Sequence, residues 1–152
     1  MSSKDQMENC KICEREISSR RTSGLCGHCK RLRDRVDIRN LKLKKRHDPK
    51  AREIALRSSW VAGNGQFICM YSGVPLFSLA RQSRSPLYLS LDHRIPGQED
   101  YVVTCRLIND MKGILDDDEF RHIILDLADY FRGHKEASSA LHSRMTLIQK
   151  QY

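Results

Sequence analysis

The sequence predicts an α+β protein assembled from small modules. Three observations point to this class: two Cys-x-x-Cys pairs within the first 30 residues, short β-branched and aromatic runs between residues 66 and 105, and helical spacing of apolar residues on both sides of those runs. At 152 residues, the chain is too short for a barrel or a doubly wound enzyme. Because 39% of its residues are hydrophobic and 30% are charged, its cores must be modest, but wholesale disorder is excluded.

Two cysteine pairs define the N-terminal module, residues 1–30. Cys10 and Cys13 form the first pair, twelve residues follow, and Cys26 and Cys29 form the second. Each pair closes a tight turn, and the loop between them lets four thiolates surround a Zn²⁺ ion at ~2.3 Å. Four cysteines complete such a site, so the histidine inside the second pair is not needed as a ligand. We therefore expect a zinc ribbon or knuckle with one structural zinc per chain, whose folding depends on the metal.

Residues 31–60 are predicted to form a basic helical connector. Apolar residues keep a loose helical spacing after the last cysteine of the module, and Pro49 opens a second helical piece, since proline is favoured in a first turn. The first 76 residues carry a net charge of +9, whereas the remaining 76 carry −1. Such a patch suits a polyanion, most commonly nucleic acid, and a solvated helix face is the alternative. The residues expected to contact phosphate here are Lys42, Lys44, Lys45 and Arg46.

The strands are predicted in the middle of the chain. Residues 67–71 and 74–79 are strand-like runs joined by a Ser-Gly turn. Residues 87–91 and 101–105 are a second pair of such runs, separated by a polar loop. The segment 106–113 follows directly and is predicted to be a short helix closed by its terminal glycine.

The run at 87–91 ends abruptly on Asp92 and His93. A carboxylate and an imidazole contribute little to packing, but the end of a strand is a good place for catalytic groups. Arg94 follows in the loop, and Asn109 and Lys112 lie on the predicted helix. Taken singly, each of these residues has an ordinary explanation, such as a cap, a loop hydrogen bond or a solvated side chain. Their joint order and spacing are more informative.

This segment resembles the HNH endonucleases, also called ββα-metal or His-metal-finger nucleases. The matching stretches are Cys-Met-Tyr-Ser-Gly at 69–73, Leu-Asp-His-Arg-Ile-Pro at 91–96 and Cys-Arg-Leu-Ile-Asn-Asp-Met-Lys-Gly at 105–113. The resemblance covers about a third of the chain and implies a ββα-metal core over residues 61–115. It also implies an enzyme that hydrolyses DNA phosphodiester bonds with the help of a divalent metal.

The resemblance assigns roles to individual residues. His93 would be the general base that activates water, and Asp92 and Asn109 would hold one Mg²⁺ or Mn²⁺ ion. Arg94 and Lys112 would contact phosphate or remain solvated. General chemistry agrees, because an imidazole can accept a proton near neutral pH. Carboxylate and amide oxygens likewise suit a hard cation.

Two features depart from the family pattern. Many relatives surround this core with a further four cysteines, but the corresponding residues here are Cys69, Ser72, Cys105 and Ile108. Isoleucine cannot bind a metal, so we expect no zinc there and two small buried thiols that lie near each other. The middle position of the motif, usually asparagine, is taken by Asp100. Either Asp100 serves through the same acceptor oxygens, or the alignment of this short loop is shifted by one residue.

Residues 116–152 are predicted to form C-terminal helices. Four consecutive acids at 116–119 precede apolar residues at helical spacing, and Gly133 ends the pattern. Capping of a helix explains these acids better than a second metal site does. A weaker helical stretch follows from Glu136. These helices either pack on the core or join two subunits into a homodimer, and the sequence does not choose.

The expected partner is double-stranded DNA, contacted mostly at its phosphates. No apolar run approaches the ~20 residues of a membrane span, and residues 1–9 lack the apolar segment of a signal peptide, so no membrane partner is expected. We expect a cytoplasmic or nuclear protein whose six cysteines are metal ligands or thiols rather than disulfides. The rival interpretation is a non-catalytic, zinc-dependent nucleic-acid-binding or regulatory protein with an inactive HNH-like core.

Overall fold

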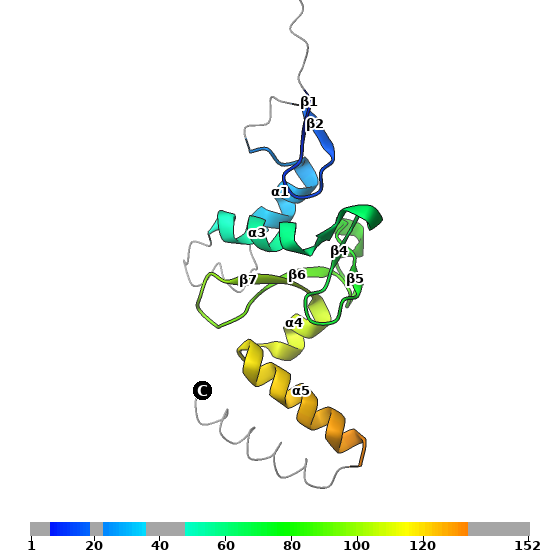
Figure 1. Cartoon of the computed structure of the whole chain (residues 1–152), viewed down its shortest axis with the longest axis vertical. Coiled ribbons are helices and arrows are strands. Elements are labelled where there is room, and N and C mark those ends of the chain that lie inside the picture. Colours follow the sequence, from blue (N-terminus) through cyan, green and yellow to red (C-terminus); the bar gives the residue numbers. More distant parts are fainter. Residues whose placement is uncertain (1–6, 19–22, 36–47, 134–152) are drawn as a thin grey trace, which may run out of the picture. The chain divides into compact units, whose positions relative to one another are not determined.

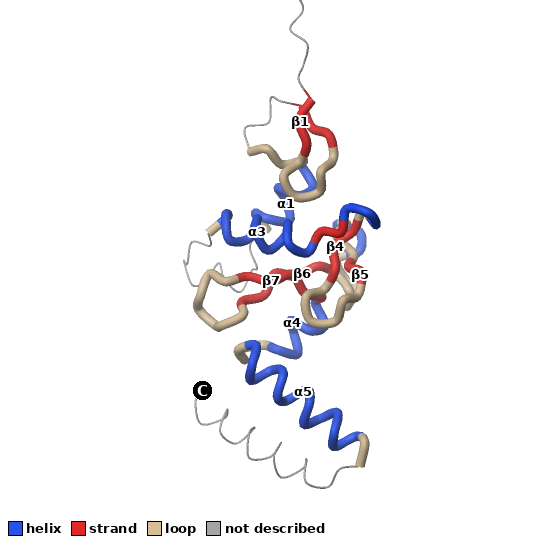
Figure 2. Tube along the Cα trace, in the orientation of Figure 1, coloured by secondary structure: helices blue, strands red, loops and turns tan. Residues whose placement is uncertain are grey.

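The computed structural model describes residues 7–18, 23–35 and 48–133 and has a mixed α+β fold (Figures 1 and 2). The described residues form three small antiparallel sheets, four α-helices and two short 3₁₀ helices. The chain divides into two compact units, Met1–Met111 and Lys112–Tyr152. None of the helices described is long and apolar enough to cross a membrane. The α+β class predicted from the sequence is therefore confirmed, while the basic run at 42–46 lies outside the described residues.

The N-terminal module is a β-hairpin followed by a helix. Strand β1 (Met7–Asn9) pairs with β2 (Glu16–Ser18), and α1 spans Gly27–Asp34. The first cysteine pair lies between the two strands, and the second lies at the start of α1. This arrangement differs from a ribbon made of strands alone. The reason is that the Cys26 sulfur accepts a hydrogen bond from the Cys29 N–H and so caps a helix. The helix therefore begins before the helical pattern of apolar residues that follows the last cysteine.

A buried arginine ends helix α1. The Arg52 Nη1 donates hydrogen bonds to the carbonyl oxygens of Arg33 and Arg35, at 3.1 and 2.9 Å, and only 5% of the Arg52 side chain surface is exposed. The last carbonyls of a helix have no partner within the helix, so a cation placed there satisfies them. Arg52 therefore has a structural role, although the sequence places it among the residues of a basic patch.

Helix α3 (Pro49–Ser59) begins at the predicted proline. The carboxylate of Asp48 accepts a hydrogen bond from the Lys50 N–H at 2.8 Å and caps the helix. Ala55 and Leu56 are buried in the core cluster that also contains the N-terminal cysteines. The helix packs against α1, β4 and β7, and Figure 1 shows it lying along the last of these strands. Helix α3, which falls within the segment predicted as a connector, thus contributes to the core of the first unit.

Three short strands follow α3. They are β3 (Trp60–Val61), β4 (Gln66–Ile68) and β5 (Pro75–Leu76), and they form one antiparallel sheet. The ring of Trp60 meets the ring of Phe67 edge-on, with the centroids 4.9 Å apart. Trp60 therefore acts as a packing residue in this sheet. Two 3₁₀ helices lie in the connections, η1 (Ala62–Asn64) and η2 (Ala80–Gln82).

A second hairpin carries the motif that ends in Asp-His. Strand β6 (Leu89–His93) pairs antiparallel with β7 (Tyr101–Cys105), and α4 (Arg106–Lys112) follows without a break. His93 lies opposite Tyr101 at the end of this pairing. Every side chain of β7 is buried, which is typical of a strand covered on both faces. The predicted order of strand, strand and helix is the one observed.

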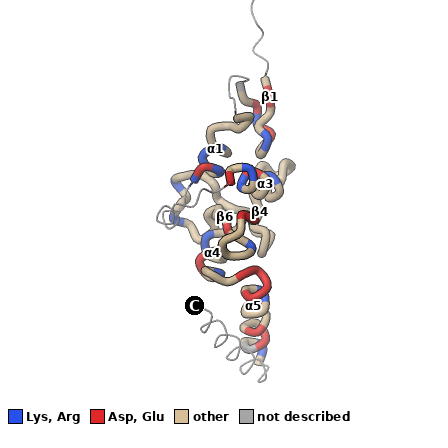
Figure 3. Tube along the Cα trace, turned by 90° about the vertical axis from the view of Figure 1, so that its left-hand side faces the viewer, with Lys and Arg blue, Asp and Glu red and all other residues tan. Residues whose placement is uncertain are grey.

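Helix α5 (Asp117–Phe131) belongs to the second unit and begins with a capping box. The Asp116 carboxylate accepts a hydrogen bond from the Glu119 N–H at 2.8 Å, and the Glu119 carboxylate accepts one from the Asp116 N–H at 3.0 Å. Figure 3 shows acidic residues gathered at the start of this helix. The interpretation of these acids as helix caps is confirmed for Asp116 and Glu119, whereas Asp117 and Asp118 pair with Lys112 and Arg121. Gly133, with φ of 88°, follows the last turn, and residues from 134 onward are not described.

Candidate functional site

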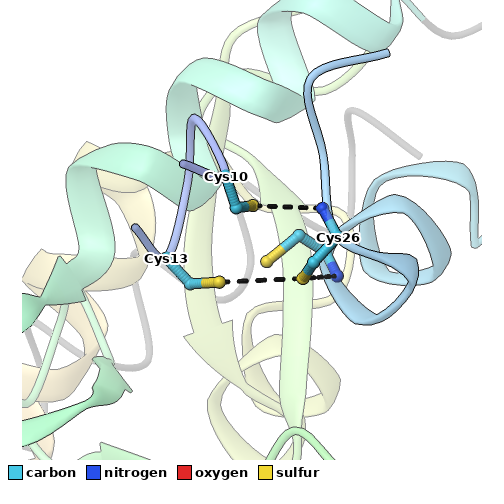
Figure 4. A group of neighbouring side chains, drawn as sticks. Cys10, Cys13 and Cys26 are labelled. Atoms are coloured by element: carbon cyan, nitrogen blue, oxygen red, sulfur yellow. Dashed lines mark hydrogen bonds between the residues drawn. The ribbon is translucent and has the colours of Figure 1, made fainter. Parts of the chain in front are cut away.

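The four N-terminal cysteines converge on one point. Cys10 and Cys13 come from the turn between β1 and β2, whereas Cys26 and Cys29 come from the start of α1. Their sulfur atoms all lie within 4.8 Å of one another, and Figure 4 shows three of these side chains turned toward each other. Four sulfurs at such distances suit a tetrahedral ion. The structure therefore confirms a four-cysteine group that could hold a metal such as zinc.

Backbone N–H groups donate hydrogen bonds to sulfurs of this group, which favours the thiolate form that binds a cation. The Cys26 N–H donates to the Cys10 sulfur at 3.3 Å (Figure 4). Burial raises the pKa of the Cys10 thiol, but nearby backbone N–H groups outweigh burial and lower the pKa to about 7. Burial and the neighbouring sulfurs raise the pKa of Cys29. Four thiolates packed this closely repel one another, so a bound cation is the natural compensation.

His28 is not part of this group. Its Nε2 lies 3.1 Å from the Ser78 hydroxyl, a partner 50 residues further along the chain. Burial, together with the charges of Arg31 and Arg15, lowers the pKa of His28. A neutral imidazole bonded to a hydroxyl joins the module to the rest of the first unit rather than serving as a fifth ligand.

An open hollow of about 400 Å³ lies beside the cysteine group. Arg15, Glu16 and Arg31 are among the residues that line it. Two guanidinium groups against one carboxylate leave the hollow positively charged, which suits a phosphate group. The sequence analysis did not select these two arginines. The sequence does contain a signal that could have identified them: each arginine lies two residues after the second cysteine of a pair.

The second group of interest lies on β6 and α4. The Asn109 Nδ2 donates a hydrogen bond to the Ser90 hydroxyl at 2.7 Å, which ties the helix to the strand. Alternate residues of a strand share a face, so Ser90 and Asp92 lie on the same face of β6. Because the amide nitrogen of Asn109 is engaged by Ser90, its oxygen is the atom left to bind a cation. A carboxylate and an amide oxygen are thus placed on one side of this strand.

Asp92 is only 6% exposed, and it receives a hydrogen bond from a tyrosine. The Tyr71 hydroxyl donates to Oδ2 of Asp92 at 3.2 Å. Tyr71 comes from the turn after β4 and also packs against the core cluster. Its contact with Asp92 was not predicted, because no local pattern links residues 71 and 92.

His93 is half-buried at the end of β6. Its ring lies 4.5 Å from the ring of Tyr101, measured between centroids, and the guanidinium of Arg52 lies 5.3 Å from the same tyrosine ring. His93 follows Asp92 directly, so both residues lie where β6 ends. The imidazole is thus supported by packing and remains partly open to solvent.

Asp100 and Arg94 face each other across the loop between β6 and β7. The Arg94 N–H donates to the Asp100 carbonyl oxygen at 3.0 Å, and the Arg94 Nε lies 3.6 Å from the Asp100 carboxylate. This pair steadies the loop that follows His93. The pair engages Arg94, which the resemblance assigned either to phosphate or to solvent.

Lys112 behaves differently from the surface lysine expected from the sequence. Only 1% of its side chain is exposed, and its Nζ lies 3.3 Å from the carboxylate of Asp117 within the second unit. A buried, paired ammonium group is not presented to a nucleic acid. We therefore leave Lys112 out of the phosphate contacts proposed below.

Cys69 and Cys105 are buried in one core cluster. Burial, followed by the neighbouring thiol of Cys69, raises the pKa of Cys105. The Cys69 sulfur also lies 3.5 Å from the Thr104 hydroxyl. Ser72 and Ile108 hold the other two positions of this region. Within the described ranges, three or more Cys, His, Asp or Glu side chains that could share a metal ion come together only at the N-terminal cysteines.

Comparison with family models, curated proteins and solved structures found no match to this chain. Its function is therefore inferred from its own residues. They provide four thiols that could hold a metal, a positively charged hollow, and a strand end where Asp92 and His93 are adjacent and the Asn109 amide is hydrogen-bonded to the same strand.

Proposed function

We propose that the chain is a metal-dependent DNA endonuclease of the HNH type, with a structural zinc in its N-terminal module. The observation that carries the proposal is the 2.7 Å hydrogen bond between Asn109 and Ser90. It places the amide of α4 on the strand face that carries Asp92, one residue before His93. Asp92, His93 and Asn109, the three residues of the sequence motif, are thereby connected through one hairpin and one helix.

Asp92 and Asn109 are the ligands proposed for the catalytic ion. Both offer hard oxygen atoms, and a site of two such ligands leaves coordination positions for water and phosphate, which suits Mg²⁺ or Mn²⁺. When bound, the ion would neutralise negative charge on the scissile phosphate and on the leaving 3′ oxygen. The low exposure of Asp92 limits competition from bulk water at this point.

His93 is the proposed general base. Its imidazole accepts a proton from a water molecule while the water oxygen attacks phosphorus. The bond between phosphorus and the 3′ oxygen breaks, and the leaving oxygen takes a proton from solvent. The products are a 5′ phosphate and a 3′ hydroxyl. The ring of Tyr101 packs against the imidazole and limits its rotation during this step.

The phosphate contacts are assigned to basic residues away from the reacting group. Arg15 and Arg31 line the hollow of the N-terminal module, and the exposed Lys30 lies beside Arg31 on α1. The run at 42–46 remains a prediction from the sequence. Contacts to the backbone position a duplex without selecting its sequence, so this part of the protein would bind many DNA sequences.

The test is cleavage of supercoiled plasmid by the purified full chain. We expect nicked or linear DNA with Mg²⁺ or Mn²⁺ and none with EDTA. His93→Ala should lower the rate by ~10²-fold or more while DNA affinity stays nearly unchanged, because the imidazole acts on the water proton. His122→Ala, which alters an exposed histidine on α5, is the matched control and should cleave normally. DNA binding without cleavage under any of these conditions would support the non-catalytic alternative.

A further inference from the structure

We propose that Tyr71 is a positioning residue that orients Asp92 toward the catalytic ion, an inference that rests on the proposed function. Its hydroxyl donates a hydrogen bond to Oδ2 of Asp92 at 3.2 Å. Tyr71 acts through this carboxylate and makes no contact of its own with the reacting atoms. The two residues are separated by 21 positions in the chain and are brought together by folding alone.

The turn that carries Tyr71 is held in place by three backbone hydrogen bonds. They run from Cys69 N–H to Val74 O at 2.9 Å, from Gly73 N–H to Cys69 O at 2.8 Å, and from Met70 N–H to Val103 O at 2.8 Å. Gly73 has φ of 67°, a conformation that glycine adopts without strain. The third bond joins the turn to β7, which is paired with the strand that bears Asp92. The phenol is therefore fixed relative to its acceptor.

A hydrogen bond to one oxygen restrains the rotation of the whole carboxylate. The terminal torsion of an aspartate is otherwise broad, so the direction in which its oxygens point is poorly defined. Asp92 is 6% exposed, and a buried carboxylate depends on hydrogen bonds for its stability. By holding Oδ2, Tyr71 sets the direction in which Asp92 meets an ion shared with Asn109. Groups that orient metal ligands in this way commonly change metal affinity by 10- to 100-fold when removed.

Removing only the hydroxyl separates positioning from packing. Tyr71→Phe keeps the ring that packs against the core cluster and deletes the donor. Tyr88→Phe is the control, because Tyr88 is a buried tyrosine of the same unit. The guanidinium of Arg35 lies 4.7 Å from the centroid of its ring. Both variants lose a tyrosine hydroxyl, but only Tyr71→Phe removes one that donates a hydrogen bond to Asp92.

The experiment measures Mn²⁺ binding to the zinc-loaded full chain by electron paramagnetic resonance of the free ion, and the Mg²⁺ concentration that gives half-maximal plasmid cleavage. We expect Tyr71→Phe to weaken both by about 10-fold or more, with the DNA affinity in EDTA unchanged and the melting temperature lowered only by the loss of one hydrogen bond. Tyr88→Phe should match the wild type in both measurements.

Equal Mn²⁺ affinity in Tyr71→Phe and the wild type would overturn the inference, as would an equal loss in Tyr88→Phe. A wild-type chain that binds no Mn²⁺ would overturn the inference and the metal-dependent nuclease together. A wild-type chain that binds Mn²⁺, loses affinity in Tyr71→Phe and cleaves no DNA would support the role of Tyr71 while rejecting the nuclease. The two proposals can therefore fail separately.

Discussion

Two regions of this chain build the same backbone turn with different side chains. In each region a cysteine N–H donates to the carbonyl five residues later, and the N–H four residues later donates back to the cysteine carbonyl. The bonds are Cys10 to Arg15 at 2.8 Å with Glu14 to Cys10 at 2.9 Å, and Cys69 to Val74 at 2.9 Å with Gly73 to Cys69 at 2.8 Å. The residue that closes the turn has positive φ in both, 56° at Glu14 and 67° at Gly73.

The likeness continues to the helix that completes each region. The residue after the first cysteine donates its N–H to the carbonyl two residues before the later cysteine, at 3.0 Å from Lys11 to Gly24 and at 2.8 Å from Met70 to Val103. The later cysteine sulfur then accepts the N–H three residues further on. These bonds are Cys29 to Cys26 at 3.4 Å and Ile108 to Cys105 at 3.5 Å. The backbone of a four-cysteine site therefore occurs twice.

The difference in side chains between the two regions indicates what a bound metal would contribute to the first. The first region has four sulfurs close together, whose mutual repulsion as thiolates a bound cation would offset. The second has two sulfurs, with Ser72 and Ile108 in the other positions, and it is held by strands, a core and hydrogen bonds. Ile12 lies buried two residues after the first cysteine, whereas Tyr71, at the equivalent position, reaches Asp92. Under the proposed function, the second turn holds Asp92 in place instead of binding zinc.

The largest effect is expected when equivalent cysteines of the two regions are replaced and the outcomes are compared. Cys10→Ser should abolish zinc binding and unfold the N-terminal module, because three thiolates no longer close the site. Cys69→Ser should keep its zinc and cost on the order of 1 kcal/mol in the free energy of unfolding. Elemental analysis and thermal melting measure the two outcomes. Zinc retained by Cys10→Ser, or lost from Cys69→Ser, would mean that the two turns do not differ in this way.

Restoring two cysteines should convert the second region into a metal site. The double variant Ser72→Cys with Ile108→Cys places sulfurs on a backbone that already has the required turn and helix start. We expect two zinc ions per chain instead of one, measured by elemental analysis. Ser72→Cys alone is the control and should remain at one. A double variant that folds and still binds a single zinc would show that the likeness of the two backbones is not sufficient.

Local patterns in the sequence predicted the features that depend on neighbouring residues. The four-cysteine group, the start of a helix at Pro49, strand β7 and the capping of α5 by Asp116 all follow from short spacings. In each case the signal is a residue type at a fixed short spacing or a run of β-forming residues along the chain. Such signals are readable without knowledge of the fold.

Features that depend on distant pairs were not predicted. Arg52 binds carbonyl oxygens 17 and 19 residues away, and in the sequence it looks like any other residue of a basic run. The bonds from Tyr71 to Asp92 and from Asn109 to Ser90 span 21 and 19 residues. The same side chain can pack, cap or position a ligand, and only its partner in the fold decides which.

A smaller effect is expected from the charge around the first region. Arg15→Gln with Arg31→Gln should weaken DNA binding by a similar factor on unrelated sequences. Each lost phosphate contact should reduce the slope of log affinity against log salt by roughly 0.9. Arg121→Gln on α5, whose arginine is 70% exposed, is the control and should leave the slope unchanged. The four basic residues at 42–46 can be neutralised in the same assay, with the same expectation.

An unchanged slope in the variant of Arg15 and Arg31 would assign the hollow to another ligand. A loss of binding confined to one DNA sequence would instead indicate contacts to bases.

The smallest expected effect concerns the bond that ties α4 to β6. Ser90→Ala releases the amide of Asn109 and should raise the Mg²⁺ concentration for half-maximal cleavage by about five-fold, as expected for ~1 kcal/mol from one hydrogen bond. Ser90→Thr keeps a hydroxyl and should restore most of the affinity. The zinc content should be the same in both variants. If Ser90→Ala required no more Mg²⁺ than the wild type, Asn109 would not depend on this bond for its orientation.

The most direct test of the division between the two regions is a single sample assayed for zinc and for cleavage. The wild-type chain is passed over a chelating resin that removes weakly held divalent ions. We predict that it keeps one zinc per chain, loses plasmid cleavage completely, and regains it on addition of Mg²⁺ or Mn²⁺. Cleavage that persists on the zinc alone, or that disappears only when the zinc is lost, would contradict the account.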